Sequence, residues 1–207
     1  MADQDPLTVE IGHSAGVYTL RGLTIVRGQG GRVWDDRGRA YIDCIAGHGA
    51  AILGHAHPAV ARALADQAGR LISCPGTFAN DVRAALLARL ARVTGFPRFF
   101  LCNSGAEAVE AAAKFARLAT GRPGFVAAMR GFHGRTVGAL SLTWEPKYRR
   151  PFEPLMPEVT HVPFNDLEAA AHAVSEQTAA IIVEPVQGEG GRAPGLPELF
   201  GRPEGPV

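Results

Sequence analysis

Lysine and cysteine are both scarce in this sequence. Among its 21 basic residues only Lys114 and Lys147 are lysine, so chemistry that needs a lysine amine has just these candidates. The 3 cysteines, Cys44, Cys74 and Cys102, are widely spaced and include no C-x-x-C pair. This pattern argues against a disulfide framework and against a zinc site. We therefore expect no metal centre, and thiols that are buried as small hydrophobic side chains.

Long apolar runs and a dominant charge are also missing. No apolar run approaches the roughly 18 residues that a membrane-spanning helix needs, and residues 1–10 are polar and acidic, unlike a signal peptide. The net charge is +1 and the basic residues are scattered, which argues against a nucleic-acid or membrane partner. With 46% hydrophobic and 20% charged residues, the sequence is typical of a globular protein, and we expect it in the cytoplasm.

Clusters of turn residues divide the first part of the sequence into short apolar segments. The segments that read as strands are 23–27, 32–34 and 41–44. Gly30-Gly31 and Asp36-Arg37-Gly38 separate them, which predicts a small β-meander. Helices are predicted from Pro58 to about residue 71 and from 81 to 93, because apolar residues recur there at helical spacing and proline suits a first helical turn.

Strands and helices alternate in the second part of the sequence. The predicted strands are 99–102, 125–129, 161–162 and 179–183, and the predicted helices are 106–119, 167–175 and, as a short helix or turn, 137–142. Alternation with continuous apolar strands predicts an α/β fold, with a mostly parallel sheet covered by helices on both faces. Ligands of such sheets bind beyond the carboxyl ends of the strands, where Ser104, Phe132 and Glu184 fall.

The segment 103–108, Asn-Ser-Gly-Ala-Glu-Ala, lies between a predicted strand and a predicted helix. Its small residues let the backbone approach a ligand, and the first N–H groups of a helix can bind a phosphate. An ordinary serine-capped helix is the alternative. The sequence has no P-loop signature and no G-x-G-x-x-G after its first strand, so an unrelated nucleotide-binding domain lacks support.

Several loops at strand ends carry candidate chemistry together. They are the segments 103–108, 131–136, 143–149 and 184–191. With these loops the chain resembles the class III aminotransferases, which are pyridoxal-phosphate enzymes of the aspartate-aminotransferase-like fold (fold type I), and within them the acetylornithine aminotransferase group. Segments 129–135 and 143–152 are similar to the branch that transaminates lysine attached to an amino-group carrier protein. The resemblance covers about residues 23–191.

The resemblance implies roles for individual residues. Ser104, Gly105 and Ala106 would bind the phosphate of pyridoxal 5'-phosphate, and Phe132 would stack over its pyridine ring. Arg135 would bind the substrate carboxylate, which suits the planar fork of arginine. Glu189 resembles the family glutamate that pairs with an arginine near the substrate side chain. Glu184 resembles a supporting residue near the cofactor. Phe132 as a core aromatic and Arg135 as a surface arginine are the alternatives.

Other polar residues near these motifs receive structural interpretations. His133 could line the pocket or be structural, and we assign it no catalytic role. His55 and His57 have no ligand partner at metal spacing and read as a turn before a helix. Glu107 and Glu110 are interpreted as first-turn carboxylates that the helix dipole favours.

The resemblance also implies an activity. It is the transfer of an ω-amino group from acetylornithine or carrier-linked lysine to 2-oxoglutarate, in arginine or lysine biosynthesis, by a homodimer. Ornithine, succinylornithine and 4-aminobutyrate are alternative donors, and a non-catalytic remnant or phosphate-binding module is the alternative function. In the family, the Schiff-base lysine and the carboxylate that pairs with the pyridine nitrogen follow the 184–191 motif, and neither Lys114 nor Lys147 occupies that lysine position. We therefore assign no catalytic residue and expect the chain alone to be inactive.

The domain organisation is expected to be partial. Residues 1–60 are predicted to form an amino-terminal segment of the small domain, and 61–191 the first part of the large, cofactor-binding domain. Proline and glycine crowd the segment 192–207, for which we predict disorder or loose attachment. The resemblance ceases after Gly191, so we expect this tail to arise from a truncation or a change of reading frame.

Overall fold

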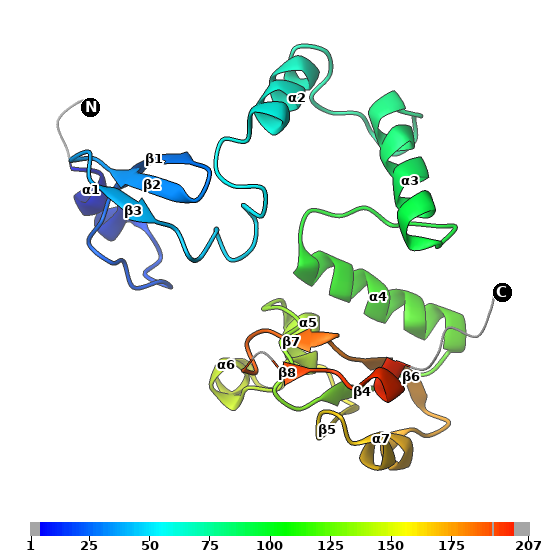
Figure 1. Cartoon of the computed structure of the whole chain (residues 1–207). Coiled ribbons are helices and arrows are strands. Elements are labelled where there is room, and N and C mark those ends of the chain that lie inside the picture. The colour runs from blue at the N-terminus through cyan, green and yellow to red at the C-terminus, as the bar shows by residue number, and fades with distance from the viewer. Residues whose placement is uncertain (1–4, 192, 201–207) are drawn as a thin grey trace. The chain divides into compact units, whose positions relative to one another are not determined.

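The computed structural model describes residues 5–191 and 193–200. The chain divides into two compact units, Met1–Ala85 and Leu86–Val207 (Figure 1). Helix α3 (Asp81–Thr94) crosses this boundary. Among the described residues, no helix has both the length and the apolar character that crossing a bilayer requires.

The first unit contains the predicted β-meander. Its strands β1 (Ile25–Gln29), β2 (Arg32–Asp35) and β3 (Ala40–Ile42) are antiparallel and lie in the order β1-β2-β3. The short helix α1 (Pro6–His13) precedes them, capped by the Asp5 carboxylate, which accepts from the Thr8 N–H at 3.1 Å. The predicted helix after Pro58 is also confirmed as α2 (Pro58–Ala68), with its proline in the first turn.

Asp35 holds the turn between β2 and β3. It is 2% exposed and accepts hydrogen bonds from the Arg39 N–H at 2.8 Å and the Tyr41 hydroxyl at 2.9 Å. Burial raises the pKa of this carboxyl, but these hydrogen bonds and the Arg39 guanidinium outweigh it and bring the pKa to about 2. The carboxylate therefore stays ionised and ties the hairpin together.

The second unit contains a parallel sheet between helices. Its strands β4 (Gly124–Ala128), β5 (Val159–Val162) and β6 (Thr178–Ile182) lie in the order β5-β4-β6, and every residue of β4 is buried. Helix α4 (Gly105–Thr120) contacts β6, and α7 (Leu167–Ala173) contacts β5 from the other side of the sheet (Figure 1). The predicted α/β architecture is therefore present, with its central strand buried on both faces.

The prediction of a strand at 99–102 is wrong. These residues are irregular, because a strand requires a neighbour that exchanges backbone hydrogen bonds and none pairs with them in the described part of the chain. The Phe100 ring instead meets the Phe115 ring of α4 edge-on, with the centroids 5.5 Å apart. One side chain of the apolar run thus contacts α4, and the run lies outside the described sheet.

Short elements complete the second unit. They are α5 (Val137–Leu142), α6 (Pro146–Arg149), η1 (Arg150–Phe152), β7 (Val186–Gln187), β8 (Ala193–Pro194) and η2 (Pro197–Phe200). The prediction of a loose tail is wrong for residues 193–200, because β8 pairs with β7, the Gly195 N–H donates to the Pro185 carbonyl at 2.8 Å, and the Leu196 N–H donates to the Asn165 amide oxygen at 2.9 Å. The rest of that prediction, Arg192 and 201–207, lies outside the described residues.

The expectation of buried thiols is also wrong. Cys44 and Cys102 are exposed, Cys74 is half-buried, and all of them are free. Each lies in a loop rather than in a strand of the sheet, so none is enclosed in the core.

Candidate functional site

The segment 103–106 forms a capped helix start. Ser104 is the N-cap of α4, and its hydroxyl oxygen accepts from the Glu107 N–H at 3.2 Å. The Glu107 carboxylate accepts in return from the Ser104 hydroxyl at 3.1 Å and from the Asn103 N–H at 2.7 Å. The Asn103 N–H and then the Ser104 hydroxyl lower the pKa of Glu107. The N–H groups of Gly105 and Ala106 have no acceptor among the described residues, as the first positions of a helix leave them unpaired.

The loop 131–136 packs directly against this helix start. A Cβ atom at Gly134 would lie 2.9 Å from the Cβ of Ala106 and equally close to the Cβ of Ala139. Gly134 also has a φ of 136°, a conformation that L side chains rarely adopt. Glycine is therefore required for the loop to touch α4 at this point.

Hydrogen bonds from distant segments fix the same loop. The Phe132 N–H donates to a Glu184 carboxylate oxygen at 2.8 Å, and the His133 N–H donates to the Thr143 hydroxyl at 2.9 Å. The Trp144 N–H donates to the Gly131 carbonyl at 3.0 Å. Residues that are far apart in sequence thus hold the Phe132 backbone in one position.

The turn between β7 and β8 lies over the end of β4. The Gln187 amide donates to the Met129 carbonyl at 2.8 Å, and a Cβ at Gly190 would lie 2.6 Å from the Arg130 carbonyl oxygen. Arg130 has a φ of 63°, which turns the chain out of the strand. This packing brings Glu189 to the same strand end as Phe132.

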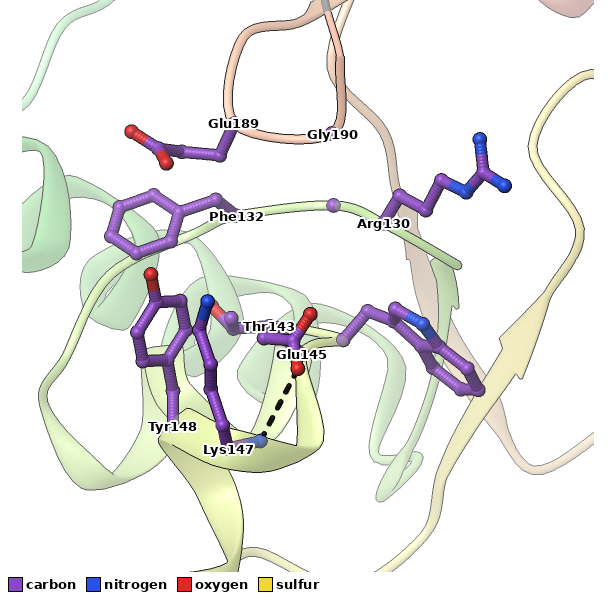
Figure 2. Close-up of a pocket in the computed structure, with 10 residues that line it drawn as sticks. Arg130, Phe132, Thr143, Glu145, Lys147, Tyr148, Glu189 and Gly190 are labelled. Atoms are coloured by element: carbon purple, nitrogen blue, oxygen red, sulfur yellow. Dashed lines mark hydrogen bonds between the residues drawn. The ribbon is translucent and has the colours of Figure 1, made fainter.

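A cavity of about 330 Å³ lies among these segments (Figure 2). It is lined by Arg130, Gly131, Phe132, Thr143, Trp144, Glu145, Lys147, Tyr148, Glu189 and Gly190. The Phe132 and Tyr148 rings meet edge-to-face, with centroids 6.4 Å apart and planes at 80°. In Figure 2 the Tyr148 and Lys147 side chains extend from α6 toward Phe132, whereas the Arg130 side chain extends away from it.

His133 lies next to the site but is buried under the loop. Its residue is 8% exposed and its Nε2 atom has no partner among the described residues. Burial, and secondarily the nearby His161, lowers its pKa to about 4. A neutral, enclosed imidazole fits a structural role. Among the described residues, His161 is the titratable group that contributes to the pKa shift of His133.

The structure brings some of the predicted site residues together. Phe132 and Glu189 line the cavity, and Glu184 is bonded to the Phe132 backbone. The turn of Ser104, Gly105 and Ala106 adjoins them through the contact of Ala106 with Gly134. Arg135 is exposed and is not among the residues that line the cavity in the described part of the chain.

The segment 143–149, one of the loops predicted to carry chemistry, supplies half of the cavity lining, but the roles of its individual residues are not evident from the sequence. Thr143 is fully buried, and its hydroxyl organises the loop, yet a threonine at the end of a short helix gives no such signal. The interpretation of Glu110 as a carboxylate of its own first turn is wrong. It accepts from the Gly138 and Ala139 N–H groups, at 3.0 and 3.3 Å, and so caps the start of α5. No sequence signal indicates this role; in the structure, Glu110 supplies the capping bonds that Thr136, the N-cap of α5, does not make with its side chain.

The histidines of the first unit precede α2, as their interpretation as a turn requires. The His55 Nε2 atom lies 2.6 Å from the Asp43 carboxylate, and His57 is the N-cap residue of α2. Across residues 5–191 and 193–200, no group of His, Cys, Asp or Glu side chains is arranged to hold a metal ion.

Comparisons with known proteins identify relatives of this chain. A family model described as aminotransferase class-III matches residues 14–202, so the expectation that the resemblance ceases after Gly191 is wrong. The LysW-aminoadipate semialdehyde transaminase of Deinococcus radiodurans is 52% identical, over 96% of this chain and 48% of that protein. The acetylornithine aminotransferase of Methanopyrus kandleri is 50% identical, over 84% of this chain and 45% of its own length. The chain thus spans about half the length of these curated relatives.

Solved structures of aminotransferases also match this chain over about half of their length. The ornithine aminotransferase of Toxoplasma gondii matches with a TM-score of 0.88 at 32% identity, covering 94% of this chain and 48% of that one. That structure is described with pyridoxal phosphate at partial occupancy in its active site. The match confirms the predicted α/β fold of pyridoxal-phosphate-dependent aminotransferases, present here over about half of its length.

Proposed function

Because the chain belongs to the class III aminotransferase family, we propose that it supplies the phosphate- and ring-binding part of an ω-aminotransferase site. The donors are acetylornithine or carrier-protein-linked lysine, and the acceptor is 2-oxoglutarate. The contact of Ala106 with the Gly134 backbone carries the proposal, because it joins a helix end suited to an anion with a loop that presents an aromatic ring.

The residues present fit pyridoxal phosphate. The unpaired N–H groups of Gly105 and Ala106 can donate to a phosphate, and nothing lies within 4 Å of the position a Cβ would take at Gly105. Phe132 is half-buried and its ring contacts the Tyr148 ring, so part of the residue remains accessible to a ligand. When bound, the cofactor would supply the electron sink that amino transfer requires.

Each residue of the chain then has a defined task. The start of α4 holds the phosphate by its N–H groups and its dipole, while Glu107 keeps the Ser104 hydroxyl engaged in the cap. Phe132 fixes the plane of the ring, and Glu184 fixes Phe132 through its backbone. Arg135 binds the substrate carboxylate, and Glu189 pairs with an arginine beside the substrate side chain.

The reacting amine is assigned to no residue of this chain. Lys114 is exposed on α4, and Lys147 stands on α6 beside Tyr148. We therefore propose that the chain binds the cofactor but does not transfer amino groups alone. In the whole assembly, we propose a cytoplasmic homodimer in which 1–60 belongs to the small domain and 61–191 to the large domain.

The names of the relatives support the substrate class. Two of them are named for LysW-linked aminoadipate semialdehyde and for acetylornithine. Both names describe substrates whose reacting group lies at the end of a side chain. Ornithine, succinylornithine and 4-aminobutyrate remain the alternatives, to be separated by assays on a full-length relative.

A matched pair of variants at Gly105 tests cofactor binding. Gly105→Pro removes the first N–H of α4, and Ser104 already has the extended backbone (φ −150°, ψ 160°) that a following proline requires. Gly105→Ala keeps the N–H and meets open space. Titrating the purified chain with pyridoxal phosphate, followed by fluorescence, should show a loss of about tenfold or more for the proline variant alone, since a hydrogen bond to a charged group is worth about 1.5–3 kcal/mol.

The controls separate the proposal from its alternatives. Pyridoxal, which lacks the phosphate, should bind weakly and equally to both variants. Saturation by inorganic phosphate with no preference for pyridoxal phosphate would favour a simple phosphate-binding module. Reduction of the mixture with borohydride, followed by mapping of labelled lysines, tests the activity: no label on either lysine together with no amino transfer supports a binding role, and turnover would overturn the expected inactivity.

A further inference from the structure

Strand β6 lies at an edge of the parallel sheet, but its sequence is that of an interior strand. It pairs with β4 on one side and with no described strand on the other. Its residues, Thr-Ala-Ala-Ile-Ile, include no charge and no proline, and Val183 extends the apolar run. Its register irregularity, beside Gly124, precedes the regular pairing of residues 180–182. Edge strands usually carry charges or prolines, whereas strands with neighbours on both sides read as continuous apolar runs.

The opposite edge of the sheet is built differently. Strand β5 contains Thr160 and His161, and Pro163 follows it directly. Thr160 is exposed, and the His161 ring contacts Trp144. Polar side chains and a nearby proline hinder the addition of another strand. In the described part of the chain, the sheet therefore has a protected edge at β5 and an open edge at β6.

An apolar hollow of about 280 Å³ adjoins the open edge. Residues of β4, β5, β6 and α7 line it, and β6 contributes Ile181 and Val183. Ile181 is 51% exposed, although Ala127 of the neighbouring β4 is fully enclosed. Covering this surface would remove apolar side chains from water, which favours a partner that brings apolar side chains as well as a strand.

The length of the relatives indicates what covers this surface. The matched region makes up about half of each aligned relative, so an equal length of polypeptide belongs to the same fold outside it. Residues 99–102 support this view, because they form an apolar run with no partner strand among the described residues. The described fold thus leaves unpaired both an edge strand and a second segment of strand-like composition.

We propose that the β6 edge and the adjoining hollow bind a second polypeptide, one that carries the other half of the class III fold. This partner adds a strand parallel to β6 and places apolar side chains in the hollow. Backbone hydrogen bonds along the edge supply affinity, and the hollow supplies specificity. The inference goes beyond the proposed function, because strand pairing needs no cofactor. Failure of the cofactor titrations with the Gly105 variants would therefore leave it standing.

Co-expression with a defined partner tests this proposal. The probe is the portion of the Deinococcus radiodurans relative that this chain does not match, with boundaries at which it reassembles with that protein's own matching portion. The full chain carries an affinity tag and is compared as wild type, Ile181→Glu, Ile181→Val and Thr160→Glu. Ile181→Glu places a carboxylate at a half-exposed position of the isolated chain, but the partner would bury it.

Thr160→Glu is the matched control, because it introduces the same charge at an exposed position of the opposite edge strand. Circular dichroism shows whether each variant is folded. The wild type, Ile181→Val and Thr160→Glu should retain the probe in a one-to-one complex, seen by native mass spectrometry. Ile181→Glu should retain about tenfold less or lower, since an unpaired charge would be buried.

Hydrogen exchange locates the contact. Amides of β6 should exchange about tenfold or more slowly in the complex than in the isolated chain, with a smaller change in β5. The inference is overturned if the wild type does not retain the probe, if Ile181→Glu retains it equally, or if β6 is already protected without it. Protection that rises with concentration together with the mass of a dimer would show that a second copy of this chain occupies the edge instead.

Discussion

The Glu184 carboxylate accepts a hydrogen bond from the Phe132 backbone N–H at 2.8 Å, although 52 positions separate the residues in sequence. Phe132 follows β4 and Glu184 follows β6, and these strands are neighbours in the parallel sheet. The bond thus ties the carboxyl ends of adjacent strands together. It makes the position of the Phe132 ring depend on a carboxylate that binds the Phe132 backbone.

Replacement of Glu184 should therefore loosen the loop. Glu184→Ala leaves the Phe132 N–H without its acceptor in a half-buried place and should cost about 1–3 kcal/mol in the free energy of unfolding. Glu184→Gln keeps an oxygen acceptor and should cost less. Urea denaturation monitored by circular dichroism measures both, and equal stabilities of the two variants would contradict the assignment.

Gly134 should tolerate no side chain. Gly134→Ala places a Cβ 2.9 Å from both Ala106 and Ala139 at a φ of 136°, and should destabilise the second unit by about 1–3 kcal/mol through strain and overpacking. Gly105→Ala is the control, because it meets open space and removes a helical glycine. A wild-type melting curve for Gly134→Ala would show that the loop does not pack on α4.

His133 should make stability depend on pH. Its pKa falls from 6.5 to about 4 in the folded chain, so the unfolded chain binds more protons between these values. Stability is then present above pH 6.5 and is lost as the pH falls toward 4, by up to about 3 kcal/mol at about 1.4 kcal/mol per unit. Burial also lowers the pKa of His161, which adds in the same direction.

Tryptophan fluorescence can isolate this effect. With Trp34 replaced by phenylalanine, Trp144 reports on the second unit, and its ring lies 5.2 Å from that of His161. Urea titrations at pH 7, 6, 5 and 4.5 on this background measure the free energy of unfolding. It should fall more steeply with decreasing pH in the chain that keeps His133 than in the His133→Gln variant. A parallel pH dependence in the two chains would assign the loss to other groups.

The cysteines should react with thiol reagents without denaturant. Cys44 and Cys102 are exposed and should be modified first, and the half-buried Cys74, whose thiol contacts the Pro75 carbonyl at 3.7 Å, more slowly. Mass spectrometry after brief exposure to a maleimide identifies the modified positions. Protection of Cys102 would indicate that the segment before α4 is covered in solution.

The chain in isolation should be weakly stable. Large apolar side chains lie open to solvent, among them Ile72 at 87%, Ile52 at 85% and Leu118 at 84% exposure. Exposed apolar surface of this kind favours association with other copies or partners. Strong binding of a hydrophobic dye and concentration-dependent aggregation are expected on heating, and a sharp cooperative melt of a soluble monomer would argue against this.

The sequence predicted those elements whose signal is local. Helix α4 follows from its serine cap, its acidic first turn and its apolar spacing, and β4 from a continuous apolar run. The error at 99–102 arose because strand formation depends on a partner strand, which the segment itself does not encode. The same limit applies to β8, whose pairing with β7 comes from the register of a hairpin rather than from periodicity.

The residues of the candidate site show the same contrast between local signals and long-range contacts. Ser104, Phe132 and Glu189 stand in compact motifs that the sequence displays directly. Thr143, Lys147 and Tyr148 lie in the segment 143–149, which the sequence also singles out, but they reach the cavity because α5 and α6 turn the chain back toward Phe132. Their individual contacts depend on this long-range placement, which has no local signature in the sequence.

Glu110 sets the rotation of α4 about its own axis. Its carboxylate is bound to the Gly138 and Ala139 N–H groups, and each residue of an α-helix is turned about 100° from the next. A slip of α4 by one residue would break these bonds and would also swing the Gly105 and Ala106 N–H groups away from the loop of Phe132. A single carboxylate within the helix thus fixes the orientation of the N–H groups at the helix start.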